Sequence, residues 1–186
     1  ATKYYSGHSD VMGGSLAVNK KVFKHVYKYN KVTGHRMSPD DAYLIIRGLR
    51  TLDIRLEQHQ ENTKKITIWL SKQKKIKEVL YPYKPSSRRY KLWKKYYTGA
   101  TGLLGLIIKS KNKNSVIKFV NSLKLFGMGY SWGGYESLVI YQEMQQIGKR
   151  EFSPIQKGEH VVRLHIGLED PKDLINDLKK SLRFIK

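Results

Sequence analysis

The feature that most constrains the fold is an unbroken apolar run, Leu-Leu-Gly-Leu-Ile-Ile, at residues 103–108. A strand that is apolar on both faces must be covered on both, so this run predicts a central strand of a layered sheet. A polar turn at 109–114 follows, and Ser115 is the expected N-cap of a short helix. The apolar side of that helix should consist of Val116, Ile117, Val120 and Leu123. A strand followed by such a helix predicts an α/β fold.

Two consecutive helices are predicted in the first half of the chain. Ser38 is a good N-cap and Pro39 suits the first helical position, so a helix should begin here, carry residues 42–46 inward and end near Gly48. A second, longer helix is expected over residues 51–73. Its inward positions are those that recur at helical spacing: Leu52, Leu56, His59, Thr63, Ile66 and Leu70.

The end of the chain predicts one strand and one helix. Residues 161–166 alternate as a strand does. The alternation places Val162, Leu164 and Ile166 on one face, and Arg163 and His165 on the other. Asp170 as N-cap and Pro171 at the first position begin the last helix. Its buried stripe should be Leu174, Leu178, Leu182 and Ile185.

The remaining segments carry weaker signals. We expect a buried strand at 15–18, a helix at 20–29, a loop at 30–37 and a short strand at 79–81. The basic run at 72–77 is expected to be the solvated end of the long helix, where it complements the helix dipole. Residues 82–97 interleave basic and aromatic side chains as a binder of single-stranded nucleic acid would, but a surface loop with one amphipathic turn is the preferred interpretation.

The net charge of +21 also raises the possibility of a nucleic-acid partner. Lysine outnumbers arginine 27 to 9, however, the lysines are spread over the whole length, and alanine occurs only four times. This composition is typical of drift toward A+T-rich codons. We therefore expect a modest, nonspecific affinity for polyanions and no specific nucleic-acid partner.

Several classes of site and location are disfavoured. Cysteine is absent, so the chain has neither a disulfide framework nor a thiolate metal site. No metal site is expected at His165, since no second ligand lies at a useful spacing. No apolar run approaches the roughly 18 residues of a spanning helix, and no signal peptide opens the chain, so a soluble, cytoplasmic protein without membrane contact is expected.

One lysine near the beginning has unusual neighbours. Lys3 lies between Thr2 and the aromatic pair at 4–5, and a segment rich in Gly, Ser and His follows at 6–14. A lysine can serve as the amine of a Schiff base with a carbonyl cofactor if its surroundings leave part of it neutral. On its own, however, one lysine among 27 is more simply a solvated surface residue.

Two further segments have the composition of a ligand site. Residues 125–138 alternate aromatic and small side chains, so the backbone can approach a ligand while rings form flat walls. An ordinary irregular pair of strands is the alternative. Arg163, on its strand, is suited to hold a planar carboxylate through two parallel hydrogen bonds, although an exposed strand arginine without a ligand is common.

Together these segments resemble a known family. Residues 2–4 and 7–14 are similar to the cofactor-lysine motif of the transsulfuration enzymes, the pyridoxal-phosphate enzymes of Cys and Met metabolism. The resemblance implies that Lys3 carries pyridoxal 5'-phosphate as a Schiff base and that Thr2 helps to hold the cofactor phosphate. The segment 131–138, Ser-Trp-Gly-Gly-Tyr-Glu-Ser-Leu, resembles the active-site segment of the bacterial cystathionine β-lyases of this family.

The same resemblance implies the substrate contacts. Ser131 would touch the substrate carboxylate, Trp132 with Tyr130 would line the substrate pocket, and Arg163 would bind the α-carboxylate. The sister enzymes that form cystathionine by γ-replacement usually have another residue at the position of Trp132. The implied reaction is therefore β-elimination of L-cystathionine to homocysteine, pyruvate and ammonia, a step of methionine biosynthesis.

The implied fold is the α/β, fold-type I architecture of these transferase-like enzymes. Residues 1–49 would be the end of the large cofactor domain and residues 50–186 the small α+β carboxy-terminal domain. On the same resemblance we expect the chain to be the carboxy-terminal part of a longer enzyme, a homo-oligomer that is tetrameric in the family, and to have little lyase activity alone. An inactive remnant, a γ-synthase or γ-lyase, and a basic nucleic-acid binder remain as alternatives.

Overall fold

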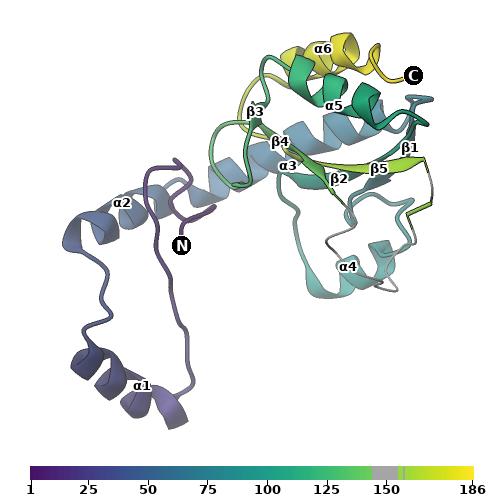
Figure 1. The fold of residues 1–186 in the computed structure, drawn as a ribbon. Helices are drawn as coiled ribbons and strands as arrows, with labels where there is room; N and C mark the ends of the chain where they lie inside the picture. Colours follow the sequence, from purple (N-terminus) through teal and green to yellow (C-terminus); the bar gives the residue numbers. More distant parts are fainter. Residues whose placement is uncertain (144–154, 157) are drawn as a thin grey trace.

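The computed structural model describes residues 1–143, 155, 156 and 158–186, which form an α/β structure (Figure 1). The helices are α1 Lys20–Thr33, α2 Pro39–Leu49, α3 Leu52–Leu70, α4 Tyr90–Tyr96, α5 Lys113–Ser122 and α6 Pro171–Leu182. The strands are β1 Ile76–Leu80, β2 Leu103–Lys109, β3 Gly127–Met128, β4 Leu138–Gln142 and β5 Glu159–His165. Across the described ranges, no helix has both the length and the apolar character needed to cross a membrane.

The strands form one sheet in the order β1-β2-β5-β4-β3. Neighbouring strands are antiparallel except β3 and β4, which are parallel. The apolar run at 103–108 lies in β2, which is paired on both edges as predicted, to β1 on one side and to β5 on the other. In the second pairing Leu104 lies opposite Leu164 and Gly105 opposite Arg163.

Helices α3, α5 and α6 cover one face of the sheet, while α4 lies on the other (Figure 1). The predicted alternation of β5 is confirmed, because Val162, Leu164 and Ile166 are fully buried in the core under the three helices. The predicted stripe of α6 is confirmed as well. The core residues of these helices are Ile66, Leu70, Val116, Phe119, Val120, Leu174, Leu178 and Leu182.

Most predicted helix starts are confirmed at atomic level. The Ser38 side chain accepts a hydrogen bond from Asp41 N, and Asp170 accepts one from Lys172 N. The prediction for α5 was wrong by one turn. Asn112 is its N-cap and accepts from Asn114 N at 3.0 Å, while Ser115 is buried inside the helix and bonded to the Ser110 hydroxyl. Asparagine caps as well as serine, so the earlier cap prevailed.

Three predictions about the first 80 residues were wrong. Residues 15–18 form no strand and residues 15–17 are exposed, because no described strand lies alongside to pair with them. The helix predicted over 20–29 continues through part of the expected loop and ends at Gly34, whose left-handed φ of 68° suits glycine. The basic run at 72–77 is not a helix end but a turn that leads into β1.

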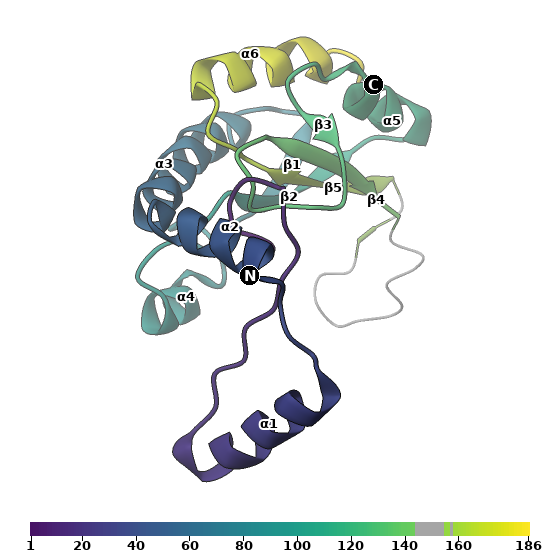
Figure 2. The same cartoon turned by 90° about the vertical axis from the view of Figure 1, so that its left-hand side faces the viewer.

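Helix α1 lies at the end of an arm, away from the sheet (Figure 2). None of its residues is buried. In α2, only Ile45 of the residues expected to face inward is buried. The long helix α3 extends from this region to the core, and its buried residues include His59, Thr63, Ile66 and Leu70, as predicted. The predicted division into domains at residue 49 falls at the junction of α2 and α3 and stays a prediction.

Candidate active site

The first 13 residues form a closed loop held by its own polar groups. The Thr2 hydroxyl accepts a hydrogen bond from Gly13 N at 2.9 Å and lies 3.3 Å from Gly13 O. The Ser6 hydroxyl donates to Thr2 O at 2.9 Å. These bonds fix the backbone on both sides of Lys3, so the Lys3 side chain extends from a well-held segment.

Arg55, in the second turn of α3, fastens this loop to the body of the protein. Its guanidinium donates to Tyr4 O at 2.8 Å and to Gly48 O at 2.7 Å, and its Nε donates to the Thr51 hydroxyl at 3.1 Å. Gly7 has a φ of 70°, and a Cβ there would lie 1.9 Å from Arg55 Nη1. The sequence analysis missed Arg55, since nothing local distinguishes it from the other eight arginines.

The structure brings Lys3 to the segment between β3 and β4. Lys3 Nζ lies 2.9 Å from Ser131 Oγ, and it also lies 5.3 Å from the centre of the Trp132 ring. Two of the predicted substrate-binding residues therefore contact the predicted cofactor lysine.

Arg163 reaches the same segment from β5. Its Nη1 donates to Tyr130 O at 2.8 Å, and its Nη2 donates to Gly129 O at 2.7 Å and to Ser131 O at 3.1 Å. Its Nε–H is buried without a partner. Arg163 thus holds the backbone that carries Ser131, and its buried Nε–H has no partner among the described residues.

The Tyr130 ring does not contact Lys3 in this arrangement. It is 82% exposed, and it lines a separate hollow of about 280 Å³ beside α5, together with Ile117, Val120, Met128 and Tyr141. The backbone oxygen of Tyr130 is the part that joins the site, through Arg163. Its predicted contact with substrate stays a prediction.

Gly133 permits the close approach of the two segments. Its φ is 84°, in the region that favours glycine, and a Cβ there would lie 2.9 Å from both Lys3 Cβ and Tyr4 N. The Gly133 amide donates to His165 Nε2 at 3.0 Å. Gly133 therefore lies close to Lys3, and the hydrogen bond from its amide to His165 holds this part of the segment in place.

Three buried or half-buried rings lie beneath the lysine. The Tyr4 ring centre is 5.4 Å from that of His59 and 6.0 Å from that of His165, and the two histidine rings are 5.3 Å apart. Burial lowers the pKa of His165 to about 4 and also lowers the pKa of His59, so both rings are neutral at pH 7. Burial likewise raises the pKa of Tyr4, whose hydroxyl accepts from Gly102 N.

Acidic side chains hold the rest of the segment between β3 and β4. Ser9 donates to Glu136 at 2.8 Å, which ties the N-terminal loop to this segment a second time. Glu169 accepts hydrogen bonds from Ser137 N at 2.6 Å and from its hydroxyl at 2.8 Å. Sequence reasoning found neither pair, because the partners are 127 and 32 positions apart. Within the described ranges, no cluster of His, Asp or Glu is placed to hold a metal.

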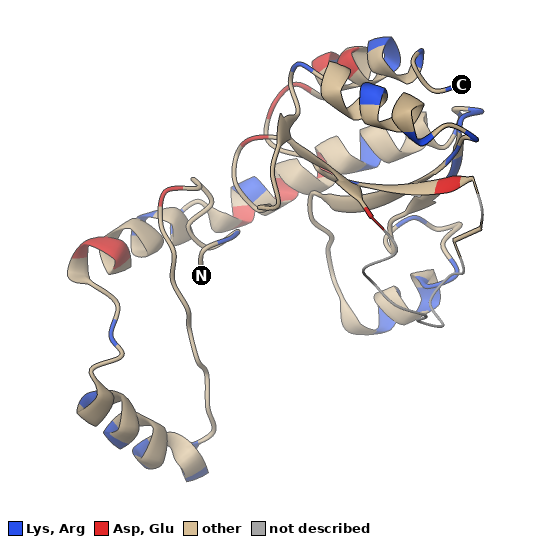
Figure 3. Ribbon diagram, in the orientation of Figure 1, with Lys and Arg blue, Asp and Glu red and all other residues tan. Residues whose placement is uncertain are grey.

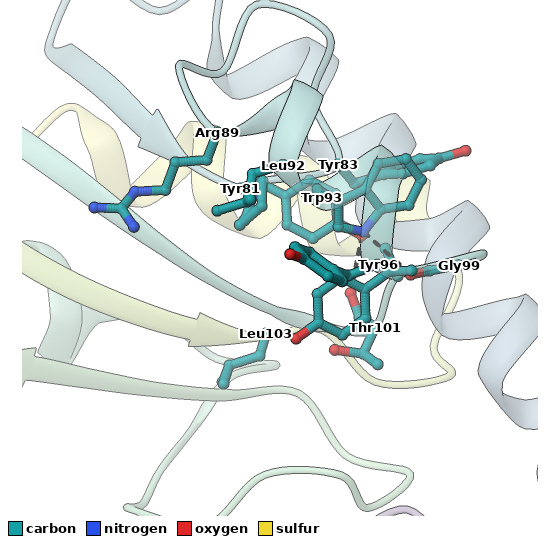
Figure 4. A pocket seen from close by; sticks show the side chains of 12 residues that line it. Tyr81, Tyr83, Arg89, Leu92, Trp93, Tyr96, Gly99, Thr101 and Leu103 are labelled. Atoms are coloured by element: carbon teal, nitrogen blue, oxygen red, sulfur yellow. Dashed lines mark hydrogen bonds between the residues drawn. The ribbon is translucent and has the colours of Figure 1, made fainter.

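A second concave region lies between α4 and the sheet (Figure 4). This cavity of about 400 Å³ is lined mainly by aromatic side chains: Tyr81, Tyr83, Trp93, Tyr96 and Tyr97. Two of its polar groups are engaged, since Tyr81 donates to Thr101 O at 3.0 Å and Trp93 Nε1 donates to Gly99 O at 3.3 Å. None of the predicted site residues lines it.

Lysine and arginine side chains are not confined to either region. Lys and Arg are spread over α1, α4, α5 and α6, and acidic residues lie at the beginnings of α2 and α6 (Figure 3). Such a distribution differs from the single basic stripe that a nucleic-acid groove presents.

The predicted cofactor residues fit pyridoxal phosphate in one respect and leave another open. The Lys3 amine is half-exposed and bonded only to a hydroxyl among the contacts described, so it can reach a carbonyl group. The Thr2 hydroxyl, however, is already bonded to Gly13, so a phosphate must compete with Gly13 O for the hydroxyl proton. The Lys3 amine is therefore better placed for the cofactor aldehyde than the Thr2 hydroxyl is for the cofactor phosphate.

Comparisons with known proteins show the family of the chain. The family described as Cys/Met metabolism PLP-dependent enzyme matches residues 1–183. The chain is 39% identical to cystathionine beta-lyase MetC of Escherichia coli over 96% of this chain and 46% of that protein. It is 37% identical to the L-alanine/L-glutamate racemase of Wolbachia pipientis, over 97% of this chain and 45% of that protein.

A solved structure gives the same result. The cystathionine gamma synthase of Xanthomonas oryzae pv. oryzae, in complex with cystathionine, superposes with a TM-score of 0.84 at 31% identity, over 98% of this chain and 48% of that one. The chain thus spans about half the length of the relatives it matches. The predicted fold-type I architecture and the predicted cofactor class are confirmed, and the chain belongs to the Cys/Met metabolism family of pyridoxal-phosphate-dependent enzymes.

Proposed function

We propose that the chain carries the lysine and the substrate side of a carbon-sulfur lyase that cleaves L-cystathionine by β-elimination. The overall reaction consumes one water and releases homocysteine, pyruvate and ammonia. The observation that carries the proposal is the contact between Lys3 Nζ and Ser131 Oγ, with Trp132 beside both. It joins an amine that can form a Schiff base to the segment that distinguishes β-lyases in sequence.

The bound cofactor supplies an aldehyde for the amine and a ring that accepts electron density. Lys3 is the attachment residue in this proposal. With cofactor and substrate bound, a free Lys3 Nζ would be placed to take the α-proton of the substrate and later to return a proton. The Ser131 hydroxyl, 2.9 Å away, accepts a hydrogen bond from Lys3 and keeps the amine on the substrate side.

Arg163 and Ser131 hold the α-carboxylate. The unpaired Nε–H of Arg163 can donate to a carboxylate oxygen while the Nη groups keep their bonds to the backbone at residues 129–131. Trp132 forms a wall next to Lys3, which limits how the rest of the substrate can lie. When the carboxylate is held, the bond to be cleaved has a fixed orientation. This orientation is the main way in which such a site can accelerate the reaction.

The relatives support more than one reaction on this scaffold. Their names include a β-lyase, a γ-synthase and a racemase, at 39, 31 and 37% identity. The β-lyase is preferred because Trp132 lies against the lysine and follows Ser131 in the β-lyase order of residues. The alternative in the same family is a γ-synthase or γ-lyase, and an inactive remnant is the alternative without catalysis. As in the family resemblance, a homo-oligomer is the proposed assembly.

The test is a product analysis with the purified protein, pyridoxal phosphate and L-cystathionine. Because the chain alone is expected to have little activity, the assay is read by the identity of the product and not by its amount. Pyruvate with homocysteine is expected, whereas 2-oxobutyrate would indicate γ-elimination and would overturn the β-lyase assignment. A parallel reaction with L-alanine tests the racemase, which racemisation there without pyruvate from cystathionine would favour. Borohydride reduction followed by peptide mapping should place the cofactor on Lys3, and it should not do so in Lys3→Ala. Label on another lysine, or none, would contradict the attachment residue independently of turnover.

A further inference from the structure

Two buried histidines beneath the candidate site each have one ring nitrogen without a described partner. They are Nε2 of His59, on α3, and Nδ1 of His165, on β5. Both side chains are fully buried, and their ring centres are 5.3 Å apart at an interplanar angle of 44°. Unpaired buried polar atoms are costly, so two of them in neighbouring rings call for a common explanation.

The proton positions on His59 follow from its other contact. Its Nδ1 lies 2.8 Å from Ile166 O, and a carbonyl oxygen can only accept. Nδ1 therefore carries the proton in the neutral ring. The unpaired Nε2 of His59 is then a lone pair, an acceptor without a donor.

His165 has two possible tautomers, and its neighbours favour different ones. Its Nε2 lies 3.0 Å from Gly133 N, which can only donate, and 3.2 Å from Gly134 O, which can only accept. One ring nitrogen cannot serve both, because it holds either a lone pair or a proton in the ring plane. If Nε2 accepts from Gly133, the proton is on Nδ1 and the unpaired atom of His165 is a donor.

The two unpaired atoms are then complementary. We propose that one buried water accepts from His165 Nδ1–H and donates to His59 Nε2, and that His59 thereby selects the His165 tautomer that holds the Gly133 amide. A donor on one ring and an acceptor on the other would give such a water two of the hydrogen bonds that buried waters make. The Tyr4 ring packs edge-on against both imidazoles and keeps them in place.

This selection affects the candidate site through the backbone. Gly133 lies against Lys3 and follows Ser131 and Trp132, the two residues that contact the amine. In the other tautomer the Gly133 amide would lose its acceptor and His165 would hold Gly134 instead. His59 and His165 are thus positioning residues for the turn over Lys3. Only this consequence for catalysis rests on the proposed function; the tautomer does not.

The test reads the tautomers directly in the purified protein, labelled with ¹⁵N-histidine, by long-range ¹H–¹⁵N spectra at pH 7.5. Both buried rings are expected to be neutral and protonated at Nδ1, with that form of His165 favoured by about tenfold or more. The exposed His25 and His35 serve as references for rings in free tautomer exchange. A wild-type His165 protonated at Nε2 would overturn the proposal, whatever the lyase assay shows.

Two variants test the coupling. His59→Leu removes the acceptor and should shift His165 toward the Nε2–H form, with faster hydrogen exchange at the Gly133 amide. His59→Gln retains a group that can both donate to Ile166 O and accept from His165, so it should preserve the wild-type tautomer and the protection of Gly133. Exchange at the Leu164 amide, in the sheet, reports whether each variant is folded. An unchanged His165 tautomer in a folded His59→Leu protein would contradict the coupling.

Discussion

Lys3 Nζ lies 2.9 Å from Ser131 Oγ although 128 positions separate the two residues in the chain. The contact joins the N-terminal loop to the segment between β3 and β4. Arg55 holds the first partner through the Tyr4 carbonyl, and Arg163 holds the second through the Ser131 carbonyl. The candidate site therefore depends on two arginines that fasten its two halves from different elements.

Ser131→Ala should lower kcat for cystathionine cleavage by about tenfold, since one hydrogen bond to the Lys3 amine is lost. Steady-state kinetics with pyruvate detection measure it. Ser86→Ala, at an exposed serine outside the candidate site, is the matched control and should leave kcat unchanged. Equal rates in both variants would show that the Lys3 contact with Ser131 has no part in turnover.

Gly133→Ala should destabilise the protein by about 3 kcal/mol or more. The added Cβ would clash with Lys3 and Tyr4, and the positive φ at this position is unfavourable for alanine. Gly34→Ala isolates the second effect. Gly34 has a similar φ of 68° but no atom within 4 Å of the added Cβ, so a loss of about 1 kcal/mol is expected. Urea unfolding of both variants gives the difference, and similar losses would contradict the close approach at Gly133.

Arg55→Lys should reduce the free energy of unfolding by about 2 to 4 kcal/mol. A lysine ammonium cannot reproduce the planar fork that reaches the Tyr4 and Gly48 carbonyls and the Thr51 hydroxyl together. Arg50→Lys, at an exposed position one residue after α2, should change stability by less than about 0.5 kcal/mol. Thermal and urea unfolding compare the two, and a loss in Arg55→Lys no larger than in the control would remove the role assigned to Arg55.

Stability should fall as the pH drops from about 6.5 to about 4. Burial lowers the pKa of His165 to about 4, so in this window the unfolded chain binds a proton that the folded chain does not. The expected loss from this group is up to about 3 kcal/mol, and His59 acts in the same direction. The ionisable and charged groups that face His165 are Tyr4, His59, Glu136 and Arg163.

The control for this pH dependence is His165→Asn, which removes the titrating ring. Its free energy of unfolding should be lower at pH 7 but should depend less steeply on pH between 6.5 and 4. Urea unfolding at several pH values measures both slopes. Parallel curves for the wild type and the variant would mean that His165 is not the group that titrates.

Much of the fold was predictable because its signals are local. The apolar run of β2, the alternation of β5 and the caps at Ser38 and Asp170 each lie within a few residues, and all four are confirmed. The strand expected at 15–18 failed for the opposite reason. A strand needs a neighbour, and the described part of the chain provides none beside it.

The sequence by itself determined the α/β layers, the family, and the identity of Lys3, Ser131, Trp132 and Arg163 as candidates, because residue type and order within short motifs carry that information. Only the tertiary structure decided which of them meet. It placed Arg163 on the carbonyls of residues 129–131, turned the Tyr130 ring away, and buried Arg55, His59 and His165 under the lysine. Those contacts join residues about 30 to 130 positions apart, and burial and hydrogen-bond geometry at such separations arise from the packing of whole elements, which no local pattern encodes.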